Sequence, residues 1–137
     1  MVELLTLGSL TPEREDLQNE RAYVQALNDL QESGAGEVVV GEVSGTVVAV
    51  AQLCFLRHLQ HQGGLCAEIE SVHVHPDFRD GGIGTQLMEE LVRRATARGA
   101  YRVQLTSNQS RVDAHRFYGR LGFTASHLGF KRFLSLN

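Results

Sequence analysis

A short run rich in glycine carries the clearest chemical signal in the sequence. It reads Arg79-Asp80-Gly81-Gly82-Ile83-Gly84 and lies between a β-branched stretch and a helical one. The first N–H groups of a helix have no partner within the helix and lie at the positive end of its dipole, so they attract anions. Glycines let the backbone approach such a ligand closely, and Arg79 adds a cationic donor. The run predicts a phosphate site, and the open alternative is a turn that only lets the helix pack on the sheet.

Two familiar phosphate motifs are excluded by their spacing. A Walker loop requires a lysine followed by serine or threonine after its second glycine, and no lysine follows these glycines. A dinucleotide fingerprint requires Gly-x-Gly-x-x-Gly, whereas Gly82-Ile83-Gly84 is followed by Thr85, Gln86 and Leu87. The motif that remains is Arg-x-x-Gly-x-Gly.

Two carboxylates precede this loop in the same predicted strand. Glu68 and Glu70 are separated by one residue, so strict alternation places both on one face. A half-buried carboxylate can have a raised pKa and accept a proton through water. A bulge in the strand would change which of the two faces a cleft, and a structural ion pair is the alternative role for either.

The surrounding sequence predicts a sheet around these residues. Valine-rich strands are expected at 37–43 and 46–57, joined by a hairpin at Ser44-Gly45, and an antiparallel strand is expected at 65–74. One apolar stripe from Ile83 onward predicts a helix that ends at Gly99. A strand at 101–106 follows that helix and should therefore lie parallel to residues 68–74.

The two ends of the chain are predicted from weaker patterns. A helical pattern covers residues 12–32, as one helix or two, and Pro12 suits a first helical position. A short helix is expected at 114–121, followed by strands at 123–126 and 130–136. No repeat, charge block or linker indicates a second domain, so residues 1–137 are predicted to form a single one.

Composition limits the classes of function. The 137 residues are 42% hydrophobic with a net charge of −3, which suits one globular domain and argues against a nucleic-acid surface. The chain shows neither a signal peptide nor an apolar run that could span a membrane. Cys54 and Cys66 lie in apolar segments and are expected to be reduced thiols. We expect a cytoplasmic protein with no membrane association.

The glycine run, following a strand that ends Val-His-Pro, resembles the pyrophosphate loop of the GNAT superfamily of N-acetyltransferases. A second stretch resembles the late segment of the same superfamily: Asn108, then Ala114-x-x-Phe117-Tyr118-x-x-Leu121-Gly122-Phe123. Within the superfamily, this tail is similar to bacterial small-amine acetyltransferases. The resemblance covers about residues 37–134 and implies the GNAT fold, an α/β (α+β) architecture with a mixed central sheet of about six strands flanked by helices.

The resemblance implies acetyl-CoA as co-substrate and assigns residues to it. Backbone N–H groups of the loop would face the diphosphate, the backbone of two strand residues would pair with the pantetheine arm, and two later side chains would contact the cofactor. The residues so assigned are Val72, Val74, Arg79, Asp80, Gly81, Gly82, Ile83, Gly84, Thr85, Asn108 and Tyr118. Core packing is the alternative for the valine side chains, and a turn is the alternative for Asn108.

The resemblance also implies the catalytic roles. Tyr118 matches the general acid that protonates the leaving thiolate. Glu68 matches a position where some members carry a general base, and Glu70 competes for that role. The Val72 N–H would polarise the thioester carbonyl. No metal is expected, because His58, His61, His73 and His75 are not spaced like a metal cage.

The predicted activity is direct transfer of acetyl from acetyl-CoA to a primary amine of a small molecule. The alternative is a non-catalytic CoA-binding module that acts as a sensor or partner subunit. One departure from the family favours that alternative slightly: only about ten residues precede Pro12, too few for the family's first strand and helix. Either the first strand is absent or Met1–Leu10 supplies a rudimentary one. Pairing into a homodimer is compatible with the sequence, which does not fix it.

Overall fold

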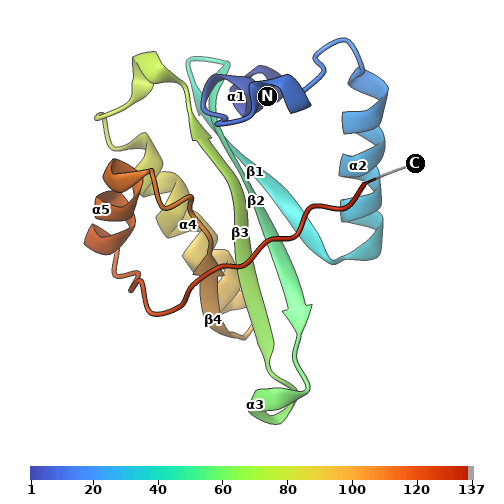
Figure 1. The fold of residues 1–137 in the computed structure, drawn as a ribbon, viewed down its shortest axis with the longest axis vertical. Coiled ribbons are helices and arrows are strands. Elements are labelled where there is room, and N and C mark those ends of the chain that lie inside the picture. The colour runs from blue at the N-terminus through green and yellow to red at the C-terminus, as the bar shows by residue number, and fades with distance from the viewer. Residues whose placement is uncertain (136–137) are drawn as a thin grey trace. The chain divides into compact units, whose positions relative to one another are not determined.

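The computed structural model describes residues 1–135, in two compact units: residues 1–105 and the segment from Thr106 onward. The first unit is built on one sheet with strand order β1-β2-β3-β4 (Figure 1). The strands are β1 (Gly36–Val43), β2 (Thr46–Arg57), β3 (Leu65–Val74) and β4 (Ala100–Leu105). The first three strands pair antiparallel and β4 runs parallel to β3, as the sequence predicts.

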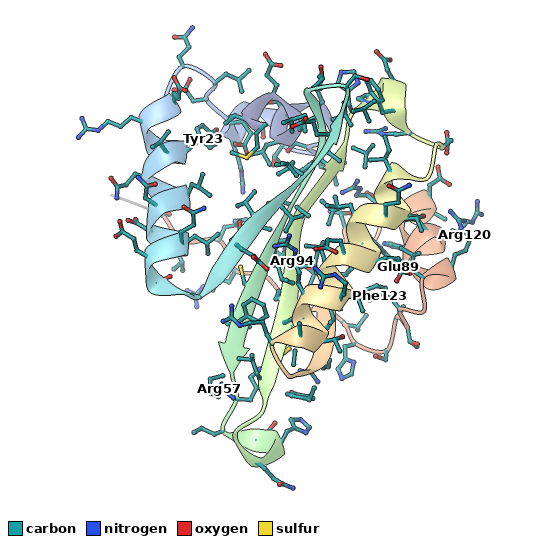
Figure 2. The ribbon with its side chains drawn as sticks, turned by 180° about the vertical axis from the view of Figure 1, so that it is seen from behind. Tyr23, Arg57, Glu89, Arg94, Arg120 and Phe123 are labelled. Carbon is teal, nitrogen blue, oxygen red and sulfur yellow. The ribbon has the colours of Figure 1, made fainter. Side chains whose placement is uncertain are left out.

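Helix α4 (Ile83–Ala97) connects β3 to β4 and covers one face of the sheet. Its apolar stripe is buried, as Leu87, Met88, Leu91 and Ala95 are each no more than 5% exposed. The facing sheet residues include Val39, Leu53 and Ile69. Arg94 of α4 lies on the side turned toward the strands (Figure 2), where its Nη1 donates to Glu37 Oε2 of β1 at 3.0 Å. The predicted helix is confirmed, and it forms the better packed side of the unit.

The opposite face of the sheet carries α1 (Val2–Leu7) and α2 (Glu20–Ser33), with the 3₁₀ turn η1 (Pro12–Arg14) between them (Figure 1). The predicted helical stretch 12–32 is therefore two elements. Residues 2–7 form a helix, so they supply no rudimentary first strand. No residue of α2 is buried, which leaves this helix loosely packed on the sheet.

Left-handed backbone conformations mark two turns of the first unit. Ser44 and Gly45 have φ values of 49° and 81°, both in the left-handed region, as a two-residue hairpin with the twist of its strands requires. The β2–β3 connection contains α3 (Gln60–Gly63), where His61 and Gln62 are left-handed at φ 54° and 58°. The sequence predicts a loop there, and the structure adds this short strained turn.

A β-bulge interrupts β3 near its carboxyl end. Val50 pairs with His73 and Gln52 pairs with Glu70, so β3 contains one more residue than β2 between these pairs. Ser71 takes a φ of 53° at this point. A bulge of this kind bends the strand and re-aims the residues that follow.

The second unit contains α5 (Val112–Arg120), which begins two residues earlier than predicted. The rings of Phe117 and Phe123 both lie near the Tyr118 ring, with centroids 5.4 and 6.1 Å from it.

The strands predicted at 123–126 and 130–136 are not found: residues 123–135 form no strand, and Leu136 lies outside the described residues. A strand requires a partner strand to which its backbone is hydrogen-bonded. The apolar pattern of Phe130, Phe133 and Leu134 does not determine whether such a partner lies alongside. The described sheet therefore has four strands rather than about six, within the predicted mixed α/β class.

Within residues 1–135, no helix combines the length and the apolar character needed to cross a bilayer.

Candidate active site

The glycine loop turns from β3 into α4 through an unusual series of backbone conformations. After the 3₁₀ turn η2 (Pro76–Phe78), Arg79 is extended, Asp80 has φ 64° and Gly82 has φ 84°. Left-handed residues alternating with ordinary ones turn successive N–H groups toward one side, which makes an anion-binding concavity. Gly82 is the N-cap of α4, no side chain caps this end, and the first turn of the helix holds no acidic residue. The N–H groups of Ile83, Gly84 and Thr85 therefore begin the helix without a side-chain cap.

The residues of this loop leave room for a diphosphate, in addition to offering it backbone N–H donors. Residues 79–82 are exposed. Around Gly82 there is open space, and a Cβ on Gly81 would approach only the Phe78 carbonyl oxygen, at 3.9 Å. A bulky anion can reach the backbone here, because neither the glycines nor their neighbours fill the concavity.

Arg79 has a positioning role that sequence reasoning did not predict. Its Nε donates to the Val74 carbonyl oxygen at 3.1 Å, at the last residue of β3. This hydrogen bond ties the loop to the end of the strand. The end of the guanidinium lies near Gly8, where an added Cβ would be 3.8 Å from Arg79 Nη2.

The last residues of β3, beside the loop, extend beyond β4. Pairing of β3 with β4 ends at Ile69 and Leu105, and in the part of the chain that the structure describes no other strand continues it. The bulge and the last residues of β3 therefore lie beyond the end of its pairing with β4. Val72 and Val74 lie in this stretch, and an extended chain of a ligand could pair with their backbone groups as a further strand does.

Glu68 and Glu70 lie before the bulge, so their alternation is preserved and they share a face. Glu68 is half-buried and accepts a hydrogen bond from Gln104 Nε2 of β4, whereas Glu70 is exposed. On β2, their partners in register are Cys54 and Gln52. Both carboxylates thus stand on the face opposite α4. Gln104, which fixes Glu68, was missed from the sequence, although the predicted parallel pairing of the two strands was the signal that could have found it.

Tyr118 lies in the second unit, on α5. Burial raises the pKa of its phenol above the ordinary value, and the nearby Arg111 guanidinium acts in the opposite direction. A phenol with a raised pKa is fully protonated at neutral pH, so it can donate a proton.

Asn108 is also in the second unit, where its side chain closes a turn. Its Oδ1 accepts from the Ser110 backbone N–H at 2.9 Å and from Ser110 Oγ at 2.8 Å. The turn expected as the alternative for Asn108 is therefore present. The side-chain nitrogen of Asn108 takes no part in these two hydrogen bonds, so they use neither of its N–H donors.

The histidines do not assemble into a metal site. Within residues 1–135, no group of three or more His, Cys, Asp and Glu side chains could hold a metal ion. His58 and His61 gather instead around Tyr101, with His58 Nδ1 at 2.7 Å from the phenol oxygen and the His61 ring centroid at 4.5 Å from the Tyr101 ring.

A model of the acetyltransferase (GNAT) family matches residues 5–123 of this sequence. The chain belongs to the GNAT family. The match covers most of the chain, and its range includes the glycine loop, both glutamates and Tyr118.

Three relatives illustrate the similarity. The chain is 37% identical over 91 residues to the aminoalkylphosphonate N-acetyltransferase of Salmonella typhimurium, a stretch that is 66% of this chain and 58% of that relative. It is 30% identical over 89 residues to the glucosamine 6-phosphate N-acetyltransferase of Schizosaccharomyces pombe, which is 65% of this chain and 78% of that one. The crystal structure of a transcriptional regulator from Bacillus halodurans C-125 superimposes with a TM-score of 0.91 at 36% identity, covering 98% of this chain and 91% of that chain. The chain thus spans little more than half the length of the Salmonella relative that it matches.

Proposed function

We propose that this protein transfers an acetyl group from acetyl-CoA to the primary amine of a small molecule. The observation that carries the proposal is the glycine loop, in which the first amides of α4 have no side-chain cap and directly follow the part of β3 that extends beyond β4. A diphosphate on the loop and an extended pantetheine arm along Val72 and Val74 use both features at once. The two enzymes named above, which are N-acetyltransferases of an aminoalkylphosphonate and of an amino sugar, support an amine acceptor.

The loop residues bind and orient the co-substrate in this proposal. Backbone groups of Arg79 through Thr85 hold the diphosphate, and the Arg79–Val74 hydrogen bond keeps the loop at a fixed place beside the strand. The backbone of Val72 and Val74 aligns the arm, and the Val72 N–H donates to the thioester carbonyl oxygen. Asn108 contributes its amide nitrogen to the arm.

The chemical step is a direct transfer. The amine nitrogen attacks the carbonyl carbon of the thioester, a C–N bond forms, and the C–S bond breaks. Glu68 takes the proton that the amine loses, directly or through water, with Glu70 as the competing base. Tyr118 gives its phenolic proton to the departing thiolate.

The test is a thiol-release assay with acetyl-CoA and a panel of primary amines. For Tyr118→Phe we expect kcat to fall by about a hundredfold or more, with little change in cofactor affinity. Because burial raises the pKa of the phenol, the alkaline loss of activity due to Tyr118 should begin at a higher pH than the ordinary pKa of a tyrosine would give. Wild-type turnover that survives unchanged in Tyr118→Phe would contradict the role of this residue.

A second function is a CoA-binding module without turnover, acting as a sensor or partner subunit. The observation that favours it is the similarity to the Bacillus halodurans protein, a transcriptional regulator by its description. This function predicts that acetyl-CoA binds, as measured by calorimetry, while no amine of the panel is acetylated. The location in the cytoplasm, the single domain, the homodimer, and the absence of nucleic-acid and membrane partners stay predictions.

A further inference from the structure

The loosely packed side of the first unit contains a large cavity, here called the α2 cavity. It has a volume of about 600 Å³ and lies between α1, α2 and the face of the sheet opposite α4. Its walls are Met1, Leu5, Tyr23, Ala26, Leu27, Asp29, Leu30, Ser33, Val38, Val50, Gln52 and Ser71. Some of these residues, such as Ala26 and Asp29, are exposed, so the cavity is open to solvent, and ligand pockets fall in the range of about 300–1,000 Å³. The α2 cavity has the size of a ligand site.

The walls of the α2 cavity offer little to an anion. No Lys, Arg or His is among the described residues that line it, and Asp29 carries the only charged side chain there. Several lining polar groups already have partners within the unit. Tyr23 donates to Glu15 Oε2 at 2.7 Å, and Ser33 Oγ donates to the Leu30 carbonyl oxygen at 3.1 Å. A phosphate or phosphonate would find no cationic side chain here, whereas an alkyl or aryl group would find apolar walls.

The cavity adjoins the reaction site assigned above. Gln52 and Ser71 form its wall toward β3, and Ser71 immediately precedes Val72, whose N–H is proposed to meet the thioester. Gln52 pairs in register with Glu70, and the next pair on the same face is Cys54 with Glu68. A primary amine whose body fills the cavity would thus present its nitrogen at the bulge, next to two carboxylates.

We propose that the α2 cavity holds the body of the acceptor, and that the acceptor is a primary amine with an uncharged alkyl or aryl body rather than a phosphorylated or phosphonylated one. This inference rests on the proposed acetyl transfer. It separates this chain from the two relatives whose named substrates carry a phosphate or a phosphonate. Asp29 and the β3 carboxylates attract the ammonium form, and the apolar walls bind the body.

The first test compares acceptors. Acetylation of 4-phenylbutylamine, ethylamine, aminomethylphosphonate and glucosamine 6-phosphate is followed at saturating acetyl-CoA. We expect kcat/KM for the phenyl amine to exceed that for either anionic amine by about tenfold or more, because its body removes apolar surface from water. A preference for either anionic amine overturns the proposal while leaving acetyl transfer established.

The second test fills the cavity. Ala26→Trp places an indole in the α2 cavity from an exposed position of α2, and Ala22→Trp places one on the same helix at an exposed residue that does not line the cavity. We expect Ala26→Trp to raise KM for 4-phenylbutylamine by about tenfold, with KM for ethylamine and for acetyl-CoA unchanged. Ala22→Trp should change none of the three. Equal effects of the two variants, or equal effects on the two amines, would refute the assignment.

Direct binding separates this inference from the proposed function. Calorimetry of 4-phenylbutylamine with the wild type and both variants, in the presence of CoA, requires no turnover. Binding lost only in Ala26→Trp supports the cavity even if no amine is acetylated, in which case only the proposed function fails. No binding to the wild type overturns the inference. A dimer that dissociates in Ala26→Trp would also overturn it, since a second copy would then be the occupant.

Discussion

The glycine loop and the α2 cavity lie on the same unit but recognise ligands in different ways. The loop is continuous in the chain, from Arg79 to Thr85, and it offers backbone amides. The cavity is lined from two helices and three strands, and it offers side chains. Behind the loop, α4 buries Leu87, Met88, Leu91 and Ala95, whereas α2 beside the cavity buries no residue.

This difference suggests that the two regions have separate roles, with the loop binding the cofactor and the cavity binding the acceptor. A diphosphate has the same shape in every turnover and can be held by amides on a well-packed helix. An acceptor pocket can diverge between relatives through side chains alone, without disturbing the sheet or the loop. Each of the following changes should affect one side and spare the other.

The largest effect is expected at Glu68, the proposed general base, which lies on the same face of the sheet as the cavity residue Gln52. Glu68→Gln should lower kcat/KM about a hundredfold at neutral pH and leave KM for acetyl-CoA near the wild-type value, because only the proton acceptor is lost. The deficit should narrow as pH rises and more of the amine arrives unprotonated. Glu70→Gln is the matched control, and pH–rate profiles of both variants make the measurement. A larger loss in Glu70→Gln would transfer the role of base to Glu70.

A smaller effect is expected at Gly82 in the loop. Gly82 has φ 84°, a conformation that costs an L-residue about 1–2 kcal/mol, so Gly82→Ala should raise KM for acetyl-CoA about tenfold and spare KM for the amine. Gly34, which ends α2 with φ 65°, provides the control. Gly34→Ala carries the same backbone strain away from the loop and should lower the thermal midpoint without changing KM for the cofactor. If the two variants bind the cofactor equally well, the loop is not its site.

A weaker effect is expected at Asp29 in the cavity. Asp29→Asn should raise KM for a cationic amine about twofold to threefold, and added salt should reduce the difference, because exposed charges are screened. KM for acetyl-CoA should not change. Initial rates at low and high salt measure the effect, and a difference that does not depend on salt would point to a steric cause instead.

The smallest effect concerns the anchoring of α4. Arg93 and then Arg94 donate to Glu90 and lower its pKa to about 2. A lowered pKa means stability that is present above the ordinary carboxyl pKa and is lost as pH falls toward 2. Because all three side chains are at least one-third exposed, Glu90→Gln should lower the thermal midpoint by only about 2 °C at neutral pH. Melting curves between neutral and acidic pH should show wild type and variant converging at the acidic end.

The sequence predicted the elements whose signals are local. The Ser44-Gly45 hairpin, the bounds of β2 and β3, the parallel pairing of β4 and the start of α4 at Ile83 all agree with the structure. The hairpin, the strand bounds and the helix start depend on residues close together in the chain, and the parallel pairing of β4 follows from the helix that connects it to β3. The strands expected after Phe123 failed for the opposite reason, because pairing depends on a partner strand that no local pattern can supply.

What the sequence alone determined is the loop and the order of elements around it, since glycine conformations, helix amides and hydrophobic periodicity act over a few residues. Tertiary structure decided the rest. The bulge at Ser71 appears only in the register between β2 and β3, Gln104 reaches Glu68 only because two strands lie side by side, and the α2 cavity exists only because α2 does not pack closely on the sheet. These features join residues far apart in the chain, and their energies depend on contacts that form only when the whole unit is folded.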